Sequence, residues 1–298
     1  MAEQDKALAT RTPKQQTILT FNNVVNGDYI QKQLKKTCGE NAGTFTTSLV
    51  ELFTNSTELQ ECDPKKVVNE AIKAASLHLP ISKLLKRAYI LTFKNKGKKE
   101  PCMVIGWQGL VDLAQRSGLY STINTDVVYE GELTKKDKLS GFIDLTGEKE
   151  SDTILGFFGY FELIKGFKKN LYITLEEMCK YAKKYAPTLK YDDKTTWEDL
   201  YKLAQEQAKS GPTGIGWKGD FISMAKKTCI RQILNYGPMS IEMQNAVQYD
   251  EEFNNAEVVR NEVVNQPKVT FDAQVITDNV QDAQAEELKQ PDLGSLND

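Results

Sequence analysis

The chain has 298 residues, of which 40% are hydrophobic and 27% are charged, a composition typical of a globular protein with one large domain or two small ones. It contains no apolar run of the ~20 residues that span a bilayer, and its N-terminus lacks a signal-peptide pattern, so we expect a cytoplasmic location and no membrane contact. The net charge of −3 combines a net of −9 over residues 249–298 with a net of +6 over residues 1–248. A basic body with an acidic tail is typical of nucleic-acid-binding proteins, although a neutral fold with a solubilising tail explains the same charges.

Cysteine and histidine usage argues against several kinds of catalytic and metal site. None of the five cysteines lies within four residues of another, so we expect reduced thiols and neither a disulfide framework nor a zinc site. The single histidine, His78, stands between two leucines, a setting that favours a core or boundary residue over a catalytic one. The sequence therefore predicts no metal site and no cofactor.

The first part of the chain is expected to be helical. Residues 1–20 are polar, and we expect a flexible N-terminus there. Helices are predicted over residues 24–36 and 45–55. A third helix begins at Asp63 and Pro64, because Asp is a good N-cap and Pro fits the first helical position, and it ends near His78.

The middle of the chain changes to strand-forming residues. Residues 88–93 and 102–105 are β-branched or aromatic and predict a hairpin with a basic tip. Residues 109–116 predict a short helix that stops at Gly118. Further strands are expected at residues 123–130, 141–145 and 154–164.

Helices return towards the C-terminus. They are predicted at residues 174–185, 197–208, 220–236 and 241–249. The fold class is therefore α+β, with helices around a small, mostly antiparallel sheet. We divide the chain into a flexible segment (1–20), a folded core (21–250) and an acidic, disordered tail (251–298).

Several segments match sequence motifs of enzymes but lack the surrounding elements or residues that those motifs require. Residues 214–219 match G-x-G-x-x-G, but a polar helix precedes them where a dinucleotide-binding fold needs a strand. Gly211 and Gly216 have P-loop spacing, yet Trp217 stands where the phosphate-binding Lys belongs. The carboxylates at 192–193 and 198–199 could be imagined as metal ligands, but a solvated surface explains them better. The sequence therefore predicts a protein that is not an enzyme.

A first basic block runs from Lys83 to Gly118. Its cations are Lys83, Lys86, Arg87, Lys94, Lys96, Lys98, Lys99 and Arg116, with Tyr89, Phe93 and Trp107 between them. Cations can follow a phosphate backbone while flat rings stack on bases. Core strand packing explains Tyr89 and Phe93 better, whereas for Trp107 both roles stay open.

A second block runs from Trp217 to Arg231. On a helix, Phe221, Ala225 and Cys229 would form a buried stripe, while other faces present Lys226, Lys227, Thr228 and Arg231. Such a helix suits phosphate contact, although an ordinary surface helix is the alternative. Lys180, Lys183 and Lys184 form a weaker third cluster.

These blocks carry a family resemblance. Residues 105–118, with the sequence IGWQGLVDLAQRSG, and residues 128–131 resemble the first signature of the RecT family of phage and prophage single-strand annealing proteins, distantly similar to the Redβ group. A second signature is present in Trp217, Met224–Thr228, Ile230-Arg231, Pro238, Ser240–Glu242 and Asp250-Glu251. The order and spacing hold from about Asn69 to Glu252.

The resemblance implies binding of single-stranded DNA and of the annealed duplex, and annealing of complementary strands in phage homologous recombination without ATP or an obligate metal. It also implies that residues 21–250 are the core for DNA binding, annealing and oligomerisation into rings or helical filaments. The implied partners are a phage-encoded 5′–3′ exonuclease and the host single-strand-binding protein. A passive single-strand binder without annealing activity, or a nuclease-accessory protein, is the alternative. The DNA-binding candidates are Lys83, Lys86, Arg87, Lys94, Trp107, Gln108, Arg116, Ser117, Lys183, Lys184, Trp217, Lys218, Lys226, Lys227, Thr228 and Arg231.

Three features leave questions open. Gln108 stands where many family members have Lys, which turns a charge contact into a neutral one. Residues 186–212 are longer and more polar than the usual link, and we interpret them as a subunit-contact or surface insertion. The acidic tail could be a spacer, an intramolecular DNA mimic or a partner-docking segment, of which we favour the last.

Overall fold

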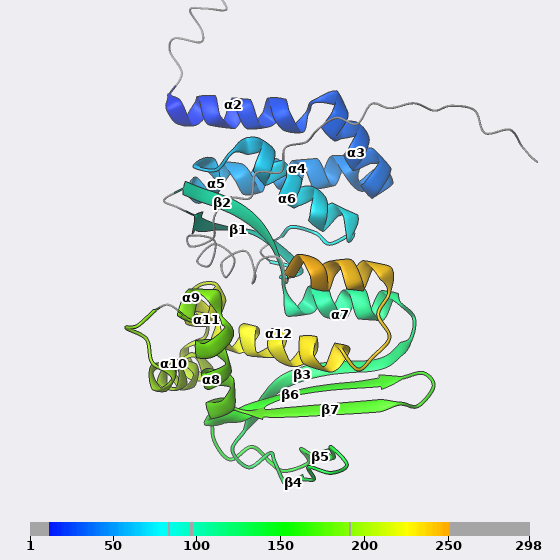
Figure 1. Cartoon of the computed structure of the whole chain (residues 1–298), viewed down its shortest axis with the longest axis vertical. Coiled ribbons are helices and arrows are strands. Elements are labelled where there is room, and N and C mark those ends of the chain that lie inside the picture. The colour runs from blue at the N-terminus through cyan, green and yellow to red at the C-terminus, as the bar shows by residue number, and fades with distance from the viewer. Residues whose placement is uncertain (1–11, 83, 96–97, 191, 251–298) are drawn as a thin grey trace, which may run out of the picture.

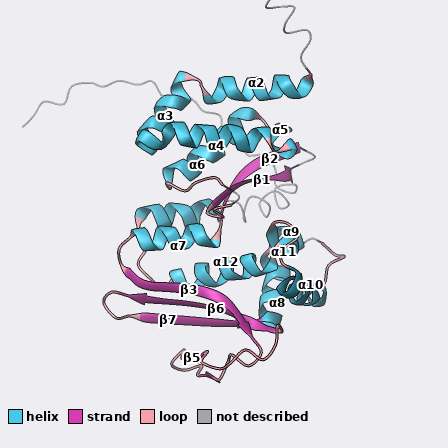
Figure 2. Ribbon diagram, turned by 180° about the vertical axis from the view of Figure 1, so that it is seen from behind, coloured by secondary structure: helices cyan, strands magenta, loops and turns pink. Residues whose placement is uncertain are grey.

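The computed structural model describes residues 12–82, 84–95, 98–190 and 192–250, and it has the mixed α+β architecture that the sequence predicts. Figure 1 shows two layers, a helical one with a two-stranded ribbon and one built on a three-stranded sheet. Two helices, α7 and the last helix at residues 241–250, lie between the layers (Figures 1 and 2). The expected acidic tail at residues 251–298 lies outside the described residues.

The N-terminal layer consists mostly of short helices. Their bounds are α2 (Pro13–Val25), α3 (Asp28–Cys38), the 3₁₀ turn η1 (Gly39–Asn41), α4 (Ala42–Thr54), α5 (Thr57–Gln60) and α6 (Pro64–Ser76). A capping box between Thr12 and Gln15 begins α2 inside the segment expected to be flexible, so the structure places residues 13–20 in a helix. The helix expected over residues 24–36 is likewise divided, because α2 ends at Val25 and Gly27 caps α3.

The third helix begins as predicted and ends in an unexpected way. Asp63 accepts a hydrogen bond from the Lys65 N–H and Pro64 is the first helical residue of α6. At the other end His78 has a φ of 53°, and its N–H donates to the Ala75 carbonyl. His78 is exposed, which corrects the expectation of a core or boundary residue. It closes α6 as a left-handed residue, a position that His enters more readily than β-branched residues do.

The predicted hairpin follows. Strands β1 (Ala88–Asn95) and β2 (Lys98–Ile105) pair antiparallel in a register that sets Ala88 opposite Ile105. Ala88, Ile90, Met103 and Ile105 are all buried in the core that also includes α6. The chain then passes directly into α7 (Trp107–Arg116), so this helix begins two residues earlier than expected.

The second layer is built on the antiparallel sheet β3-β6-β7. Its strands are β3 (Tyr120–Tyr129), β6 (Ile154–Leu163) and β7 (Lys168–Thr174), and a small ribbon of β4 (Lys135–Lys136) and β5 (Ile143–Asp144) lies beside them. The sequence did not predict β7, because its first residues, Lys168-Lys169-Asn170, lack the apolar alternation of a strand.

Helices α8 (Leu175–Tyr185), α9 (Pro187–Lys190), α10 (Trp197–Ser210), α11 (Gly216–Gly219) and α12 (Phe221–Leu234) complete this layer. Within residues 186–212, interpreted as a subunit-contact or surface insertion, α10 buries Leu200, Ala204 and Gln207, so this part of the segment packs into the fold. Gln205 also pairs with both backbone groups of Ile154 at the start of β6, at 2.9 Å each.

Helix α12 connects two hydrophobic cores. The predicted stripe of Phe221, Ala225 and Cys229 is fully buried in the core under the sheet, together with α8 and α10. Further along the same helix, Ile230 and Ile233 are buried in the core of the N-terminal layer. All five cysteines are free thiols, as expected. Among the described residues, no helix is long and apolar enough to cross a membrane.

Candidate nucleic-acid interface

Two glycines bring the Lys86-Arg87 turn against the start of α7. A Cβ on Gly106 would lie 2.1 Å from the Lys86 carbonyl oxygen, and one on Gly109 would lie 2.3 Å from that of Arg87. The Gly106 N–H donates a 2.9 Å hydrogen bond to the Arg87 carbonyl. Any larger residue at either position would push the two segments apart. The glycines therefore fix Trp107, the first residue of α7, next to this turn.

Trp107 is where the two basic blocks meet. The Lys226 Nζ lies 5.4 Å from the centroid of the indole ring and 2.7 Å from Asp126 Oδ1 on β3. Asp126 is exposed, and the side chain of Lys226 retains 18% of its accessible surface. A cation over an indole face is attracted by the ring quadrupole, which holds Lys226 at this place. We call the group of Lys86, Trp107, Gln108, Asp126 and Lys226 the junction.

The start of α7 adds a partial positive charge to the junction. Gly106 is its N-cap and supplies no side-chain acceptor for the N–H groups of the first turn. Such a helix end favours anions, because its backbone dipoles and N–H groups point outward. Gln108, half-buried in this first turn, adds a neutral amide where a lysine would have added charge.

Lys227 and Arg231 occupy a different environment. The Lys227 Nζ lies 2.6 Å from Asp250 Oδ1, and the Arg231 Nη1 lies 3.3 Å from Asp250 Oδ2. The side chains of Lys227 and Asp250 are only 11% and 6% exposed. The neighbouring Thr228 is also buried, and its hydroxyl donates to the Met224 carbonyl. The helix face that was expected to meet phosphate is therefore covered by the helix at residues 241–250.

Arg87 and Arg116 act as cross-links in the fold. The Arg87 Nε lies 2.9 Å from Asp112 Oδ2, and the Arg116 Nε lies 3.5 Å from Asp112 Oδ1. Arg116 also donates to the Leu77 carbonyl at 3.0 Å and lies 3.6 Å from Glu242. It thereby ties α7 to the end of α6 and to the last helix. Next to it, the Ser117 hydroxyl donates to the Ala114 carbonyl.

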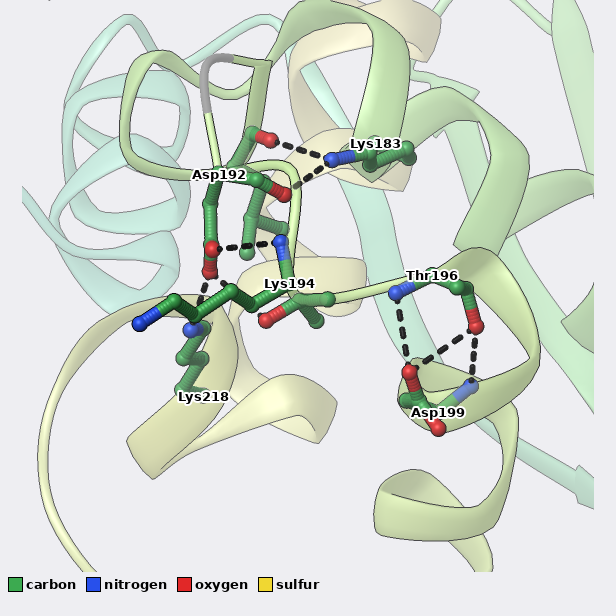
Figure 3. Close-up of polar contacts among 8 residues, drawn as sticks. Lys183, Asp192, Lys194, Thr196, Asp199 and Lys218 are labelled. Atoms are coloured by element: carbon green, nitrogen blue, oxygen red, sulfur yellow. Dashed lines mark hydrogen bonds and ion pairs between the residues drawn. The ribbon is translucent and has the colours of Figure 1, made fainter.

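In the third basic cluster Lys180 and Lys184 are exposed, whereas Lys183 is bonded to the segment that follows α8 (Figure 3). The Lys183 Nζ donates to the carbonyls of Leu189 and Asp192, at 2.8 and 2.6 Å. Lys218 forms an ion pair with the Asp192 carboxylate, and a hydrogen bond from Lys218 is the largest cause that holds the pKa of Asp192 far below its usual range. Lys183, Asp192 and Lys218 thus fasten the segment between α8 and α10.

Two of the four carboxylates considered as metal ligands, Asp192 and Asp199, have structural roles. Besides the pairing of Asp192, Asp199 forms a capping box with Thr196 at the start of α10 (Figure 3). Hydrogen bonds from the backbone and hydroxyl of Thr196 lower the pKa of Asp199. In the part of the chain that the structure describes, no three His, Cys, Asp or Glu side chains are grouped as metal ligands.

The other candidate residues fall into three groups. Trp217 is buried and packs edge-on against Phe221 at 5.2 Å between ring centroids, so its indole belongs to the core rather than to a stacking surface. Lys184 is exposed and lies 5.0 Å from the Tyr185 ring. Lys83 and the side chain of Lys94 lie outside the described residues.

Sequence reasoning missed the roles of two carboxylates. Asp126 was assigned to a strand without a role, and Asp250 was noted only as part of the second signature. No local pattern reveals either role, since Asp126 and Lys226 are 100 residues apart and meet only when β3 packs beside α12. For Asp250, the position after an amphipathic helix was the available signal.

Comparison with known proteins agrees with the two signatures. Residues 43–265 match the RecT family. The chain is 33% identical over 242 residues to the uncharacterized protein YqaK of Bacillus subtilis (strain 168), covering 80% of this chain and 75% of that one. It is 30% identical over 202 residues to protein RecT of Escherichia coli (strain K12), covering 65% of each. The chain therefore belongs to the RecT family, the single-strand annealing proteins of DNA recombination.

Proposed function

We propose that this protein binds single-stranded DNA at the junction and anneals it to a complementary strand without ATP. The observation that carries the proposal is the contact between Lys226 and Trp107, which joins the two signature blocks at one partly exposed place. Proteins of this family are in general not enzymes. Annealing needs only a surface that holds one strand in a form ready to pair.

The proposed mechanism divides the work between charge and stacking. Lys86, Lys226 and the start of α7 hold phosphates, which removes part of the repulsion between two approaching strands. Trp107 offers a flat ring on which a base of any identity can stack. The protein thereby contacts only the backbone and base faces, and Watson–Crick pairing with the incoming strand selects the sequence.

Assembly and partners extend this proposal. One junction contacts only a few nucleotides, so we propose that copies of the chain form a ring or helical filament in which successive junctions follow one strand. The exonuclease that makes the single strand, and the host single-strand-binding protein that coats it, are the proposed partners. The acidic segment at 251–298 is the proposed docking element.

An annealing assay tests the proposal directly. Two complementary oligonucleotides, one carrying a fluorophore and the other a quencher, are mixed with the purified protein without nucleotide or divalent metal. We expect duplex formation to be faster than in a protein-free reaction, and we expect added ATP to change nothing. A protein that binds each oligonucleotide but slows their pairing would be a passive binder. A requirement for ATP or metal would contradict the proposed mechanism.

A further inference from the structure

The buried carboxylate of Asp250 lies between two cations that belong to the second signature. Its two oxygens face Lys227 Nζ at 2.6 Å and Arg231 Nη1 at 3.3 Å. All three side chains are largely buried, and Arg231 is the most exposed of them at 26%. Two cations therefore surround a single negative charge. A phosphodiester carries the same single negative charge and likewise offers two terminal oxygens.

The helix that carries Asp250 is held by apolar contacts over most of its length and by ion pairs at its last residue. Near its start, the Tyr120 hydroxyl donates to the Pro238 carbonyl at 2.9 Å, and Met243 is fully buried. Towards its end, Ala246 is also fully buried, and Tyr249 packs against the same core with its ring 5.5 Å from the Lys73 ammonium. Asp250, the last residue of the helix, is held by Lys227 and Arg231. Release of Asp250 therefore requires the two ion pairs to break and only the last turn of the helix, beyond the buried Ala246, to move.

Asp250 can leave Lys227 only when another anion takes its place. A buried lysine without a counter-ion is strongly unfavourable, so Lys227 retains Asp250 until another anion replaces it. A DNA phosphate held at the junction would supply such an anion, because Lys226 and Lys227 are adjacent on α12. The acidic residues that follow Asp250 along the chain have the same sign of charge as DNA.

We infer that Lys227 and Arg231 form a phosphate-binding subsite that Asp250 occupies in the DNA-free protein and leaves when single-stranded DNA binds. This inference rests on the proposed function, because it takes the surface around Lys226 as the DNA site. It assigns to the last helix the role of an internal competitor that weakens DNA binding. The ligand of the subsite is a phosphodiester of the DNA backbone.

Replacement of one carboxylate tests the competition. In Asp250→Asn the shape is kept while the charge is lost, so we expect single-stranded DNA to bind about tenfold more tightly, the effect of one charge-assisted hydrogen bond. The slope of log affinity against log salt should stay unchanged, because a phosphate occupies the subsite in both complexes. Glu242→Gln is the matched control, since Glu242 lies on the same helix but pairs with Arg116. Its affinity should equal that of the wild type.

Hydrogen exchange of the unmodified protein supplies a second measurement, which decides the matter even if Asp250→Asn does not fold. We expect an oligonucleotide to speed amide exchange at the end of the 241–250 helix and to leave α12 protected. A folded Asp250→Asn protein with unchanged or weaker affinity, or a helix that DNA protects, would show that Asp250 only fastens the fold. If the wild-type protein and both variants failed to bind DNA, the proposed function itself would be overturned, and the subsite with it.

Discussion

Lys226 and Lys227 are adjacent in the sequence and have opposite surroundings. Adjacent residues of an α-helix point about 100° apart, so one can face solvent while the other faces the interior. Lys226 lies beside Trp107 and the exposed Asp126, whereas Lys227 is buried with Asp250. The sequence predicts that both cations contact DNA, and the structure offers only Lys226 without a prior rearrangement.

Replacement of Lys226 should weaken DNA binding without unfolding the protein. Its ion pair with an exposed carboxylate contributes at most about 1 kcal/mol to the free energy of unfolding. We expect Lys226→Ala to lower single-stranded DNA affinity about tenfold and to reduce the salt slope by about 0.7, both measured by fluorescence anisotropy at several salt concentrations. Lys202→Ala, an exposed lysine on α10, is the control and should bind like the wild type. Equal affinities of the two variants would remove Lys226 from the site.

Two glycines of the first signature determine where the short helix α7 lies. In the first signature, Gly106 and Gly109 allow α7 to start against the Lys86-Arg87 turn. The order of strands and helices was otherwise largely predictable, because apolar periodicity and capping residues mark α4, α6, α8, α10 and α12. Strand β7 was missed because pairing with β6, rather than its own composition, makes it a strand.

A methyl group at Gly109 should disturb this contact. The added Cβ would lie 2.3 Å from the Arg87 carbonyl oxygen, so the backbone must shift, and we expect Gly109→Ala to lower the free energy of unfolding by about 1–3 kcal/mol. It should also weaken DNA binding, since Trp107 moves with α7. Gly43→Ala in α4 is the control, because nothing lies within 4 Å of its Cβ. That change should stabilise the helix by about 0.5–1 kcal/mol. Urea unfolding of both variants measures the difference, and a Gly109→Ala protein as stable as the wild type would contradict the close contact.

At the scale of the whole molecule, one helix joins two cores. Phe221 and Cys229 of α12 are buried under the sheet, whereas Ile230 and Leu234 are buried with the N-terminal layer. The junction lies where these layers meet, so its geometry depends on both of them. The two layers are consequently unable to unfold independently without exposing part of α12.

We therefore expect the protein to unfold in a single cooperative transition. Loss of either core would expose apolar residues of α12, which costs about 25 cal/mol per Å² and destabilises the other core. In scanning calorimetry the ratio of the calorimetric to the van't Hoff enthalpy should be close to one. Far-UV and near-UV circular dichroism should change together. Two separate transitions would mean that the layers are independent domains.

The sequence by itself determined the fold class, most of the elements, the family and the two basic blocks, because periodicity, capping and motif spacing are local properties of a chain. It also predicted the buried stripe of α12 correctly. Only the tertiary structure decided which cations are exposed. Lys183 and Lys218 fasten a loop, Arg116 joins three helices, and Lys227 pairs with a carboxylate 23 residues away. The reason is that these cations pair with groups far away in the sequence. Such partners come together only through tertiary packing, so neighbouring residues in the sequence do not reveal them.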